Sequence, residues 1–308
     1  MTRVTVHPRS ARNKIKLDPS DRFIRGFTYA LGALTAVLCV LPFLLIIGSS
    51  FESEEAIRKF GFTLIPRMPT LYAYDIIFRS PRSIIGSYAL TICLTGAGTA
   101  VGLSLISMAG YAMQRRDYPF RNAVSFYVYF TSLFSGGLVP FYLLMVQTYN
   151  LRDSYLAVLL PLLMSPWLII LMKNFIKSIP YEITESGKID GAGDFSIFAR
   201  LIIPSMKPAL ATIGLFLAIG YWNEWYFSSL FLTSQVEFRP LQYQLYRVIN
   251  QIEALRNSYA GSVVNIGDLP GETLKMATAV IATGPIILFY PFVQKYFIAG
   301  LTVGAVKG

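Results

Sequence analysis

The chain has 308 residues, of which 54% are hydrophobic and only 14% are charged, and its formal net charge is +10. This composition excludes an ordinary soluble globular protein, in which about a quarter of the residues are charged, and favours a chain that lies in lipid. The single histidine, His7, excludes Ser-His and Cys-His catalytic pairs, and the lack of a G-x-x-x-x-G-K-[ST] motif excludes ATP hydrolysis by the usual phosphate loop.

Six segments are apolar over about 20 residues, the length that crosses roughly 30 Å of hydrocarbon as a helix. They are residues 27–49, 85–113, 123–147, 154–172, 208–233 and 274–294. Lysine and arginine are more frequent in the N-terminal tail, in residues 114–122 and 171–207 and in the C-terminal tail than in the alternate loops. The positive-inside rule therefore predicts both termini in the cytoplasm, and it accounts for the net charge without nucleic acid.

Residues 1–26 are basic and contain no apolar core, so we expect no cleavable signal peptide and expect the first span to act as the anchor. In the second span, Gly98 and Gly102 form a G-x-x-x-G step. The surrounding TGAGTAVG resembles a dinucleotide-binding turn, but no strand precedes it. We therefore expect the two glycines to let helices approach closely.

A polar segment, residues 179–207, separates the fourth and fifth spans on the predicted cytoplasmic side. Its pattern predicts a short helix over residues 181–190, a bend at Gly191 and Gly193, and a second helix capped by Asp194. The second helix carries an apolar face of Phe195, Ile197, Phe198, Leu201 and Ile202 before Pro204 and Lys207 close the segment. Two interpretations remain: docking into a partner protein, or an interfacial helix that lies on lipid headgroups.

Polar and aromatic side chains interrupt the fifth span at Tyr221, Trp222, Asn223, Glu224 and Trp225. Because polar groups are costly in a bilayer, they usually face a bundle interior or a wet cavity. The cluster could line or gate a solute path, or its polar groups could join helices by hydrogen bonds while the aromatics pack.

The predicted outer loop, residues 234–272, contains an amphipathic segment. Its apolar residues recur on one helical face: Leu241, Leu245, Val248, Ile249, Ile252 and Leu255. We expect this face to pack on the bundle and the polar residues of the loop to be available to an extracytoplasmic partner. Residues 50–82 form a second outer region of mixed charge.

The segment at 185–204 resembles the cytoplasmic coupling loop of permease subunits of ATP-binding-cassette (ABC) importers, whose pattern is E-A-A-x-x-D-G-A followed by an apolar run that ends in proline. The matching positions hold Glu185, Asp190, Gly191, Ala192, Phe198, Ile202 and Pro204. Ser186 and Gly187 replace the two alanines, and both keep the small size that close docking needs.

Other segments resemble carbohydrate-importer permeases, in the branch related to the second permease of maltose uptake, and most closely those for oligosaccharide or polysaccharide uptake in Firmicutes. The segments are GYAMQR (110–115), VPFYLLM (139–145), NFIKSIP (174–180) and QKYFIAGLTVGAVKG (294–308). In such relatives the C-terminal tail can reach the ATPase, which gives residues 302–308 an expected role; the alternative is a tail without contacts.

The resemblance implies an all-α integral membrane protein with six transmembrane helices in the type I ABC importer permease fold. It implies a permease domain over residues 27–296, between a cytoplasmic tail at 1–26 and another at 297–308. The chain would be a transporter subunit of the bacterial plasma membrane and not an enzyme, with no cofactor of its own, and with ATP and Mg²⁺ bound by a separate ATPase.

The partners implied by the resemblance are a second, non-identical permease, two ATPase subunits, a solute-binding protein and an oligosaccharide. Glu185 would lie near basic residues of the ATPase. Competing interpretations are an ABC permease for a polyamine or a phosphorylated compound, and an ion-driven transporter. Against the ion-driven transporter, Glu224 is the only acidic residue central to a span, where a buried carboxylate relay would be expected.

Overall fold

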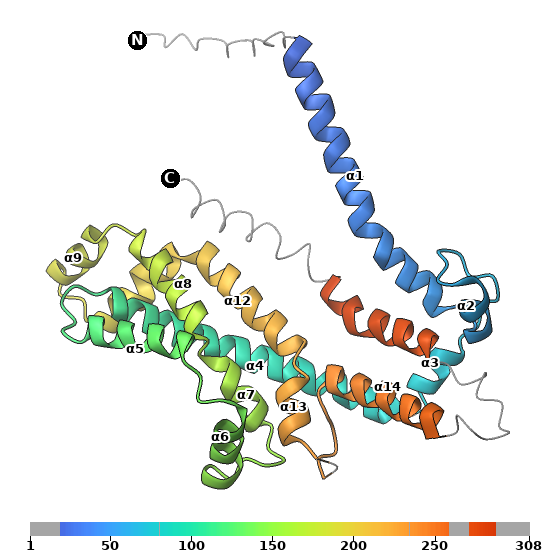
Figure 1. Cartoon of the computed structure of the whole chain (residues 1–308). Helices are drawn as coiled ribbons and strands as arrows, with labels where there is room; N and C mark the ends of the chain where they lie inside the picture. The colour runs from blue at the N-terminus through green and yellow to red at the C-terminus, as the bar shows by residue number, and fades with distance from the viewer. Residues whose placement is uncertain (1–18, 80, 234, 259–270, 288–308) are drawn as a thin grey trace, which may run out of the picture.

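A computed structural model describes residues 19–79, 81–233, 235–258 and 271–287, which form helices joined by loops (Figure 1). Within these ranges there is no strand, and one isolated bridge pairs Glu52 with Pro69. The prediction of an all-α chain is confirmed.

The elements follow one another along the chain as a series of helices and short helical turns. They are α1 (Pro19–Ser50), α2 (Glu54–Phe60), α3 (Tyr72–Ile77), α4 (Pro81–Gln114), α5 (Arg121–Leu133), α6 (Leu138–Leu143), the π-helical turn η1 (Leu144–Thr148), α7 (Leu156–Leu163), α8 (Pro166–Lys177), α9 (Glu182–Ile189), α10 (Asp194–Ile197), the π-helical turn η2 (Phe198–Ile202), α11 (Ile203–Ser205), α12 (Lys207–Trp222), α13 (Tyr226–Phe231) and α14 (Leu241–Ser258). A further helix covers residues 272–287.

The long helix α4 is the centre of the bundle, and it contacts α5, α7, α8, α12 and α14. Small residues on α4 make this possible. A Cβ atom built on Gly98 would lie 2.3 Å from the Tyr221 ring of α12, and one built on Gly110 would lie 2.8 Å from Met172 of α8. A Cβ on Gly102 would lie 3.0 Å from the carbonyl oxygen of Leu163. These three glycines of α4 therefore serve helix packing, as predicted for Gly98 and Gly102.

Three helices of the described ranges are long and apolar enough to cross a membrane: Phe23–Ser50, Pro81–Gln114 and Leu156–Lys177. If each of two pairs of helices that meet at a sharp bend is counted as one span, the described ranges hold up to five spans. The third predicted span was wrong as a continuous helix, because Arg121–Leu133 and Leu138–Thr148 meet at 113°. The break contains Gly137, which has a φ of +88°, a conformation that glycine adopts at no steric cost. The sixth predicted span is helical to residue 287, and its remainder lies outside the described ranges.

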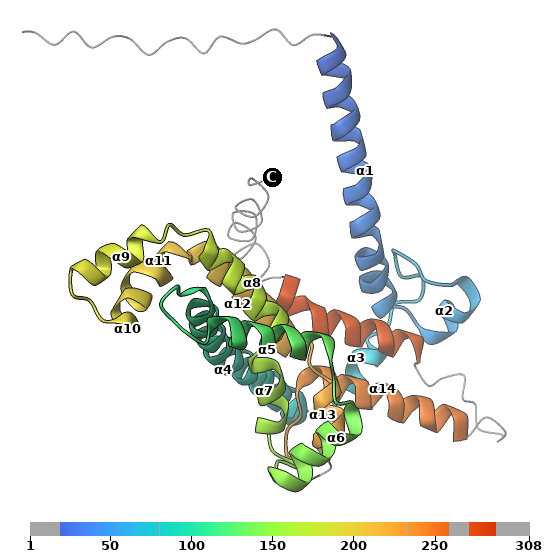
Figure 2. The same cartoon turned by 60° about the vertical axis from the view of Figure 1, so that its left-hand side comes forward.

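The two ends of the bundle differ in character. In both views α9 lies at one end and α14 at the other (Figures 1 and 2). Leu241, Leu245 and Ile252 of α14 are buried in a cluster with Trp222 and Leu274, while Leu255 is exposed. The predicted packing of this amphipathic face on the bundle is confirmed for those three leucine and isoleucine side chains.

Residues 50–79 form a folded cap at the α14 end. The buried carboxylate of Glu52 accepts hydrogen bonds from the backbone N–H groups of Arg67 and Met68, each at 2.7 Å. The carboxylate of Glu54 accepts the backbone N–H groups of Gly271 and Glu272 at 2.9 and 3.0 Å. The Glu52 bonds lie within the cap, and the Glu54 bonds connect it to the start of the helix at residues 272–287.

Candidate coupling and transport sites

The polar segment between the fourth and fifth predicted spans folds into a hairpin. It is made of α9, the turn 190–193, α10 and η2, and we call it the α9–η2 hairpin. Gly191 has a φ of +75°. Its N–H donates to the carbonyl of Lys188 at 3.0 Å, and the N–H of Ala192 donates to the carbonyl of Gly187 at 2.9 Å. This pair of bonds is the Schellman motif, which ends a helix on a left-handed residue that is usually glycine. The Schellman motif thus explains why the D-G-A part of the pattern, residues 190–192, has glycine at its centre.

The two arms of the hairpin meet at Gly187. A Cβ atom on this residue would lie 3.0 Å from side-chain carbons of both Ile197 and Leu201. Because such a distance is tighter than ordinary van der Waals contact, the absence of a side chain sets how closely α9 approaches η2.

Asp194 does not cap the second helix as predicted. The residue at the N-cap position is Gly193. Asp194 is the first residue of α10, and its side chain makes no capping hydrogen bond. Its carboxylate instead lies 2.7 Å from the guanidinium of Arg115, beyond the end of α4. An ion pair to another segment has replaced the local hydrogen bond, a choice that residue spacing along the chain cannot reveal.

The expected coupling residues divide into two groups by exposure. Phe198 and Ile202 are buried in the same cluster as Tyr111 and Met206, and Ala192 packs against that cluster. Those exposed at the surface are Glu185, Ser186, Asp190, Gly191 and Pro204. The first group packs the hairpin against the bundle, and the second group presents an outer surface.

Two large apolar side chains stand on either side of the turn at the tip of the hairpin. Ile189 is 85% exposed and Phe195 is 72% exposed. Sequence reasoning placed Phe195 on one apolar face with Ile197, Phe198, Leu201 and Ile202, and it did not single out Ile189, although its place directly before Asp190 was available as a signal. Exposed apolar groups beside charged ones are typical of a protein contact surface.

The residues predicted to line a solute path, 221–225, also fall into a bonded group and an exposed group. Tyr221 is buried and donates its hydroxyl to the carbonyl of Leu159 at 2.8 Å, and Trp222 donates its indole N–H to the carbonyl of Ala282 at 3.0 Å. Buried Glu224 accepts from the backbone N–H of Phe227 and the hydroxyl of Ser228, both at 2.5 Å, at the start of α13. Tyr221 and Trp222 therefore join helices, and Glu224 stabilises the start of α13.

Asn223 and Trp225 are exposed at the break between α12 and α13. The centres of the Trp225 and Tyr246 rings are 4.9 Å apart, and the amide of Gln242 donates to the Asn223 side-chain oxygen at 3.2 Å. Trp225, Gln242 and Tyr246 line a cavity of about 310 Å³ together with Lys275. Gln242, Tyr246 and Lys275 were not identified from the sequence, although the first two lie on α14 outside its predicted apolar face.

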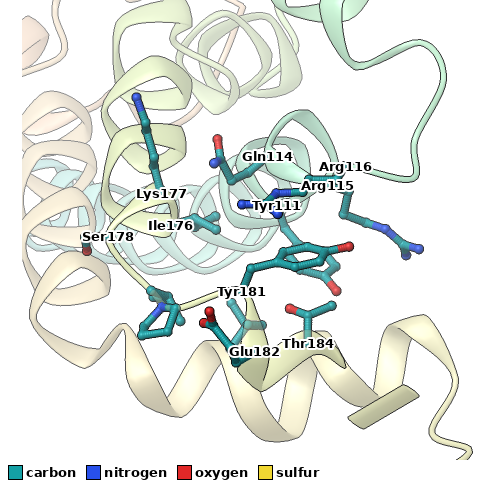
Figure 3. A pocket seen from close by; sticks show the side chains of 13 residues that line it. Tyr111, Gln114, Arg115, Arg116, Ile176, Lys177, Ser178, Tyr181, Glu182 and Thr184 are labelled. Atoms are coloured by element: carbon teal, nitrogen blue, oxygen red, sulfur yellow. The ribbon is translucent and has the colours of Figure 1, made fainter. Parts of the chain in front are cut away.

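A larger cavity of about 430 Å³ lies on the inner side of α9, between the hairpin and the ends of α4 and α8 (Figure 3). Tyr111, Arg115 and Arg116 line it from α4 and the residues that follow, and Tyr181 and Thr184 line it from the α9 side. The guanidinium of Arg116 lies 4.5 Å from the centre of the Tyr181 ring.

The chain is similar to sugar permeases over nearly its whole length. It is 39% identical over 291 residues to a polygalacturonan/rhamnogalacturonan transport system permease protein of Bacillus subtilis, covering 94% of this chain and 98% of that protein. It is 26% identical over 297 residues to a trehalose/maltose transport system permease protein of Thermococcus litoralis, covering 94% and 99%.

A solved structure shares the fold. The crystal structure of a bacterial ABC transporter involved in the import of the acidic polysaccharide alginate contains a chain that superimposes with a TM-score of 0.75 at 30% identity, covering 92% of this chain and 100% of that one. The model of the family described as binding-protein-dependent transport system inner membrane component matches residues 16–303. The chain therefore belongs to this family, and it is a permease subunit of an ABC importer.

Proposed function

We propose that the chain forms half of the membrane pathway of an importer that takes up an oligosaccharide delivered by a solute-binding protein. It pairs with a similar, non-identical permease, and two copies of a separate ATPase bind ATP and Mg²⁺. Both termini lie in the cytoplasm. The observation that carries the substrate class is the near full-length similarity to a polygalacturonan/rhamnogalacturonan permease.

The chemistry of the oligosaccharide follows from two relatives considered together. Polygalacturonan is a polymer of a sugar acid, and the similar transporter structure handles alginate, which is also an acidic polysaccharide. The substrate that we propose is accordingly an oligosaccharide that carries carboxylates. The same relatives favour a carbohydrate over a polyamine or a phosphorylated compound.

The outer surface of the α9–η2 hairpin supports docking of the ATPase. Glu185 and Asp190 supply negative charge, while Ile189 and Phe195 supply apolar area beside the turn. Apolar groups that are exposed at a water-facing hairpin gain most when a partner covers them, at about 25 cal/mol for each Å². Closure of the ATPase pair then moves the hairpin and, through it, the transmembrane helices.

Trp225, Asn223, Gln242 and Tyr246 supply the candidate contacts to the sugar. An aromatic ring offers a flat apolar face, and amide groups offer donors and acceptors to hydroxyl groups. These side chains are exposed or line a cavity, whereas Tyr221, Trp222 and Glu224 already have partners within the fold.

The experiment is transport by the purified assembly in proteoliposomes, with the binding protein and ATP supplied. We expect uptake of labelled galacturonate oligosaccharides and little uptake of a neutral glucose oligosaccharide of the same length. Mass spectrometry of the glycan that is retained on purification would give the length and linkage. Uptake of a non-carbohydrate alone would refute the proposed substrate class.

A further inference from the structure

Four charged side chains form a continuous chain of ion pairs beside the α9–η2 hairpin. Lys188 Nζ lies 2.5 Å from Asp117 Oδ2. Asp117 accepts a hydrogen bond from Arg115 Nε at 2.8 Å on its other oxygen, so the carboxylate is shared between two cations. The guanidinium of Arg115 then reaches Asp194 Oδ1 at 2.7 Å. The signs alternate along the chain as Lys188, Asp117, Arg115, Asp194.

These side chains come from separate elements. Arg115 directly follows the last residue of α4, and Asp117 lies in the turn between α4 and α5. Lys188 lies in the last turn of α9, and Asp194 begins α10. The chain of ion pairs therefore joins the end of the central helix to both arms of the hairpin, on either side of the Gly191 turn.

The cavities explain why these ion pairs matter to the position of the hairpin. The cavity of about 430 Å³ and another of about 350 Å³ both lie at the α4 end, and Tyr111 and Arg115 line both. Next to them, the Tyr111 and Phe198 rings meet with centres 5.3 Å apart. Figure 3 shows the α4 residues and the α9 residues on opposite sides of the larger cavity. The hairpin packs on the bundle through buried apolar side chains such as Phe198, with open space next to this contact.

A ring contact and a chain of ion pairs constrain motion differently. The hydrophobic effect has no preferred direction, so by itself it does not hold two surfaces in one orientation. Hydrogen-bonded ion pairs with Arg115, whose side chain is only 16% exposed, have directional geometry. The hydrogen bonds from Arg115 and Lys188 also hold the pKa of Asp117 below its usual range, so the carboxylate remains charged at neutral pH.

We propose that Arg115 and Asp117 are positioning residues for coupling: they fix the α9–η2 hairpin to the end of α4, so that movement of the hairpin becomes movement of the central helix. This rests on the proposed function of the hairpin in ATPase docking. Without the ion pairs, part of the movement of the hairpin is taken up by the adjacent cavities and does not reach α4.

The test measures the ratio of sugar transported to ATP hydrolysed in proteoliposomes that contain the complete importer and its binding protein. For Asp117→Asn we expect the ratio to fall by about threefold to tenfold, the range that corresponds to losing hydrogen-bonded ion pairs of intermediate exposure. ATPase co-purification and basal ATP hydrolysis should remain near wild type. Asp117→Glu retains the carboxylate and should recover most of the ratio.

A matched control is Arg121→Gln, which removes a basic residue at the start of α5 that makes no ion pair with another residue of the described ranges. Its ratio should equal that of wild type. If Asp117→Asn does not assemble, Lys188→Gln removes one end of the chain of ion pairs at an exposed position and should lower the ratio in the same direction.

The dependence on salt separates positioning from general stability. Raising the ionic strength should lower the wild-type ratio toward the Asp117→Asn value and should change the ratio of Asp117→Asn little. A wild-type ratio in both Asp117→Asn and Lys188→Gln would overturn this inference alone. Absence of ATP-driven sugar uptake by the wild-type assembly would instead overturn the proposed function.

Discussion

At the residue scale, the contact between Gly98 and Tyr221 shows how one position serves packing across the bundle. The absent side chain of Gly98 makes room for the Tyr221 ring, and the Tyr221 hydroxyl reaches the carbonyl of Leu159 at 2.8 Å. One glycine thereby brings α4, α12 and α7 together. Gly96, two residues earlier on the same helix, has nothing within 4 Å of its Cβ position.

Gly98→Ala and Gly96→Ala should therefore differ in their effect on thermal stability in detergent. Gly98→Ala places a carbon against the Tyr221 ring and should destabilise the fold by about 1–3 kcal/mol, as overpacking does. Gly96→Ala should be neutral or stabilising by up to about 1 kcal/mol, because alanine favours helix. Equal melting temperatures for the two variants would contradict this account of helix packing.

Glu52 is a second residue whose environment determines its behaviour. Burial by itself would raise the pKa of Glu52, but hydrogen bonds from Arg67, Met68 and Thr63 bring it below its ordinary value. A carboxylate with a lowered folded pKa contributes stability that is present above the unfolded pKa and is lost as the pH falls through the folded pKa.

Glu52→Gln should loosen the cap formed by residues 50–79, at a cost of about 2 kcal/mol for hydrogen bonds to a charged acceptor. Limited proteolysis of the cap at neutral pH should be faster in this variant than in wild type. Acidification below the folded pKa should bring wild type to the same rate. Glu55→Gln is the control, because Glu55 is exposed and its one ion pair within the described residues is with Lys59, so we expect no change.

At the element scale, the α9–η2 hairpin depends on the conformation of one turn. Gly191 has a φ of +75°, while Gly193 has a φ of −68° that any residue can adopt. Proline is confined to a φ near −65° and has no N–H, so it can neither adopt the Gly191 conformation nor donate to Lys188.

Gly191→Pro should abolish ATP-driven uptake and lower co-purification of the ATPase, while the permease remains in the membrane at wild-type level. Glu185→Lys should act in the same direction by reversing charge on the proposed docking surface without disturbing the hairpin, since Glu185 is exposed. Gly193→Ala has open space at its Cβ and should behave as wild type. Undiminished co-purification together with normal uptake in both of the first two variants would contradict the docking proposal.

The break between α12 and α13 separates two tryptophans into different roles. Trp222 is buried and bonded to Ala282, while Trp225 is 42% exposed beside Tyr246. Trp225→Ala should reduce the rate of sugar uptake several-fold with little change in melting temperature. Trp222→Phe should lower the melting temperature, because a buried carbonyl loses its donor. Normal uptake by Trp225→Ala would remove this residue from the proposed sugar path.

At the scale of the whole molecule, α1 stands away from the rest of the chain (Figures 1 and 2). Its apolar span Phe23–Ser50 has no buried residues in its most hydrophobic window. A helix that is apolar on all sides requires an apolar environment, which lipid or another membrane subunit supplies. The bundle around α4 does not supply it.

The predicted orientation can be tested with single cysteines in a background of Cys39→Ser and Cys93→Ser. In the permease expressed without its ATPase, Asp190→Cys should react with a membrane-impermeant maleimide only when the cytoplasmic face is open. A cysteine at Lys59, in the exposed part of α2, should react from outside intact cells. Labelling of both positions from the same side would refute the proposed topology.

The sequence by itself determined the features that depend on local chemistry. Apolar length predicted helices because a bilayer offers no partner to backbone groups, so each segment must satisfy its own hydrogen bonds. The bend at Gly191 was predictable because a Schellman motif involves only neighbouring residues and favours glycine. The same holds for the apolar face of α14, whose 3.6-residue period directed Leu241, Leu245 and Ile252 toward the bundle.

Only the tertiary structure decided which groups find distant partners. Asp194 pairs with Arg115 across the fold and does not cap its own helix, and Tyr221 bonds to a carbonyl 62 residues away. Those contacts divided the cluster at 221–225 into bonded residues and exposed ones. They cannot be derived from spacing along one chain, because ion pairs and hydrogen bonds form wherever packing brings two groups together, whatever their separation in sequence.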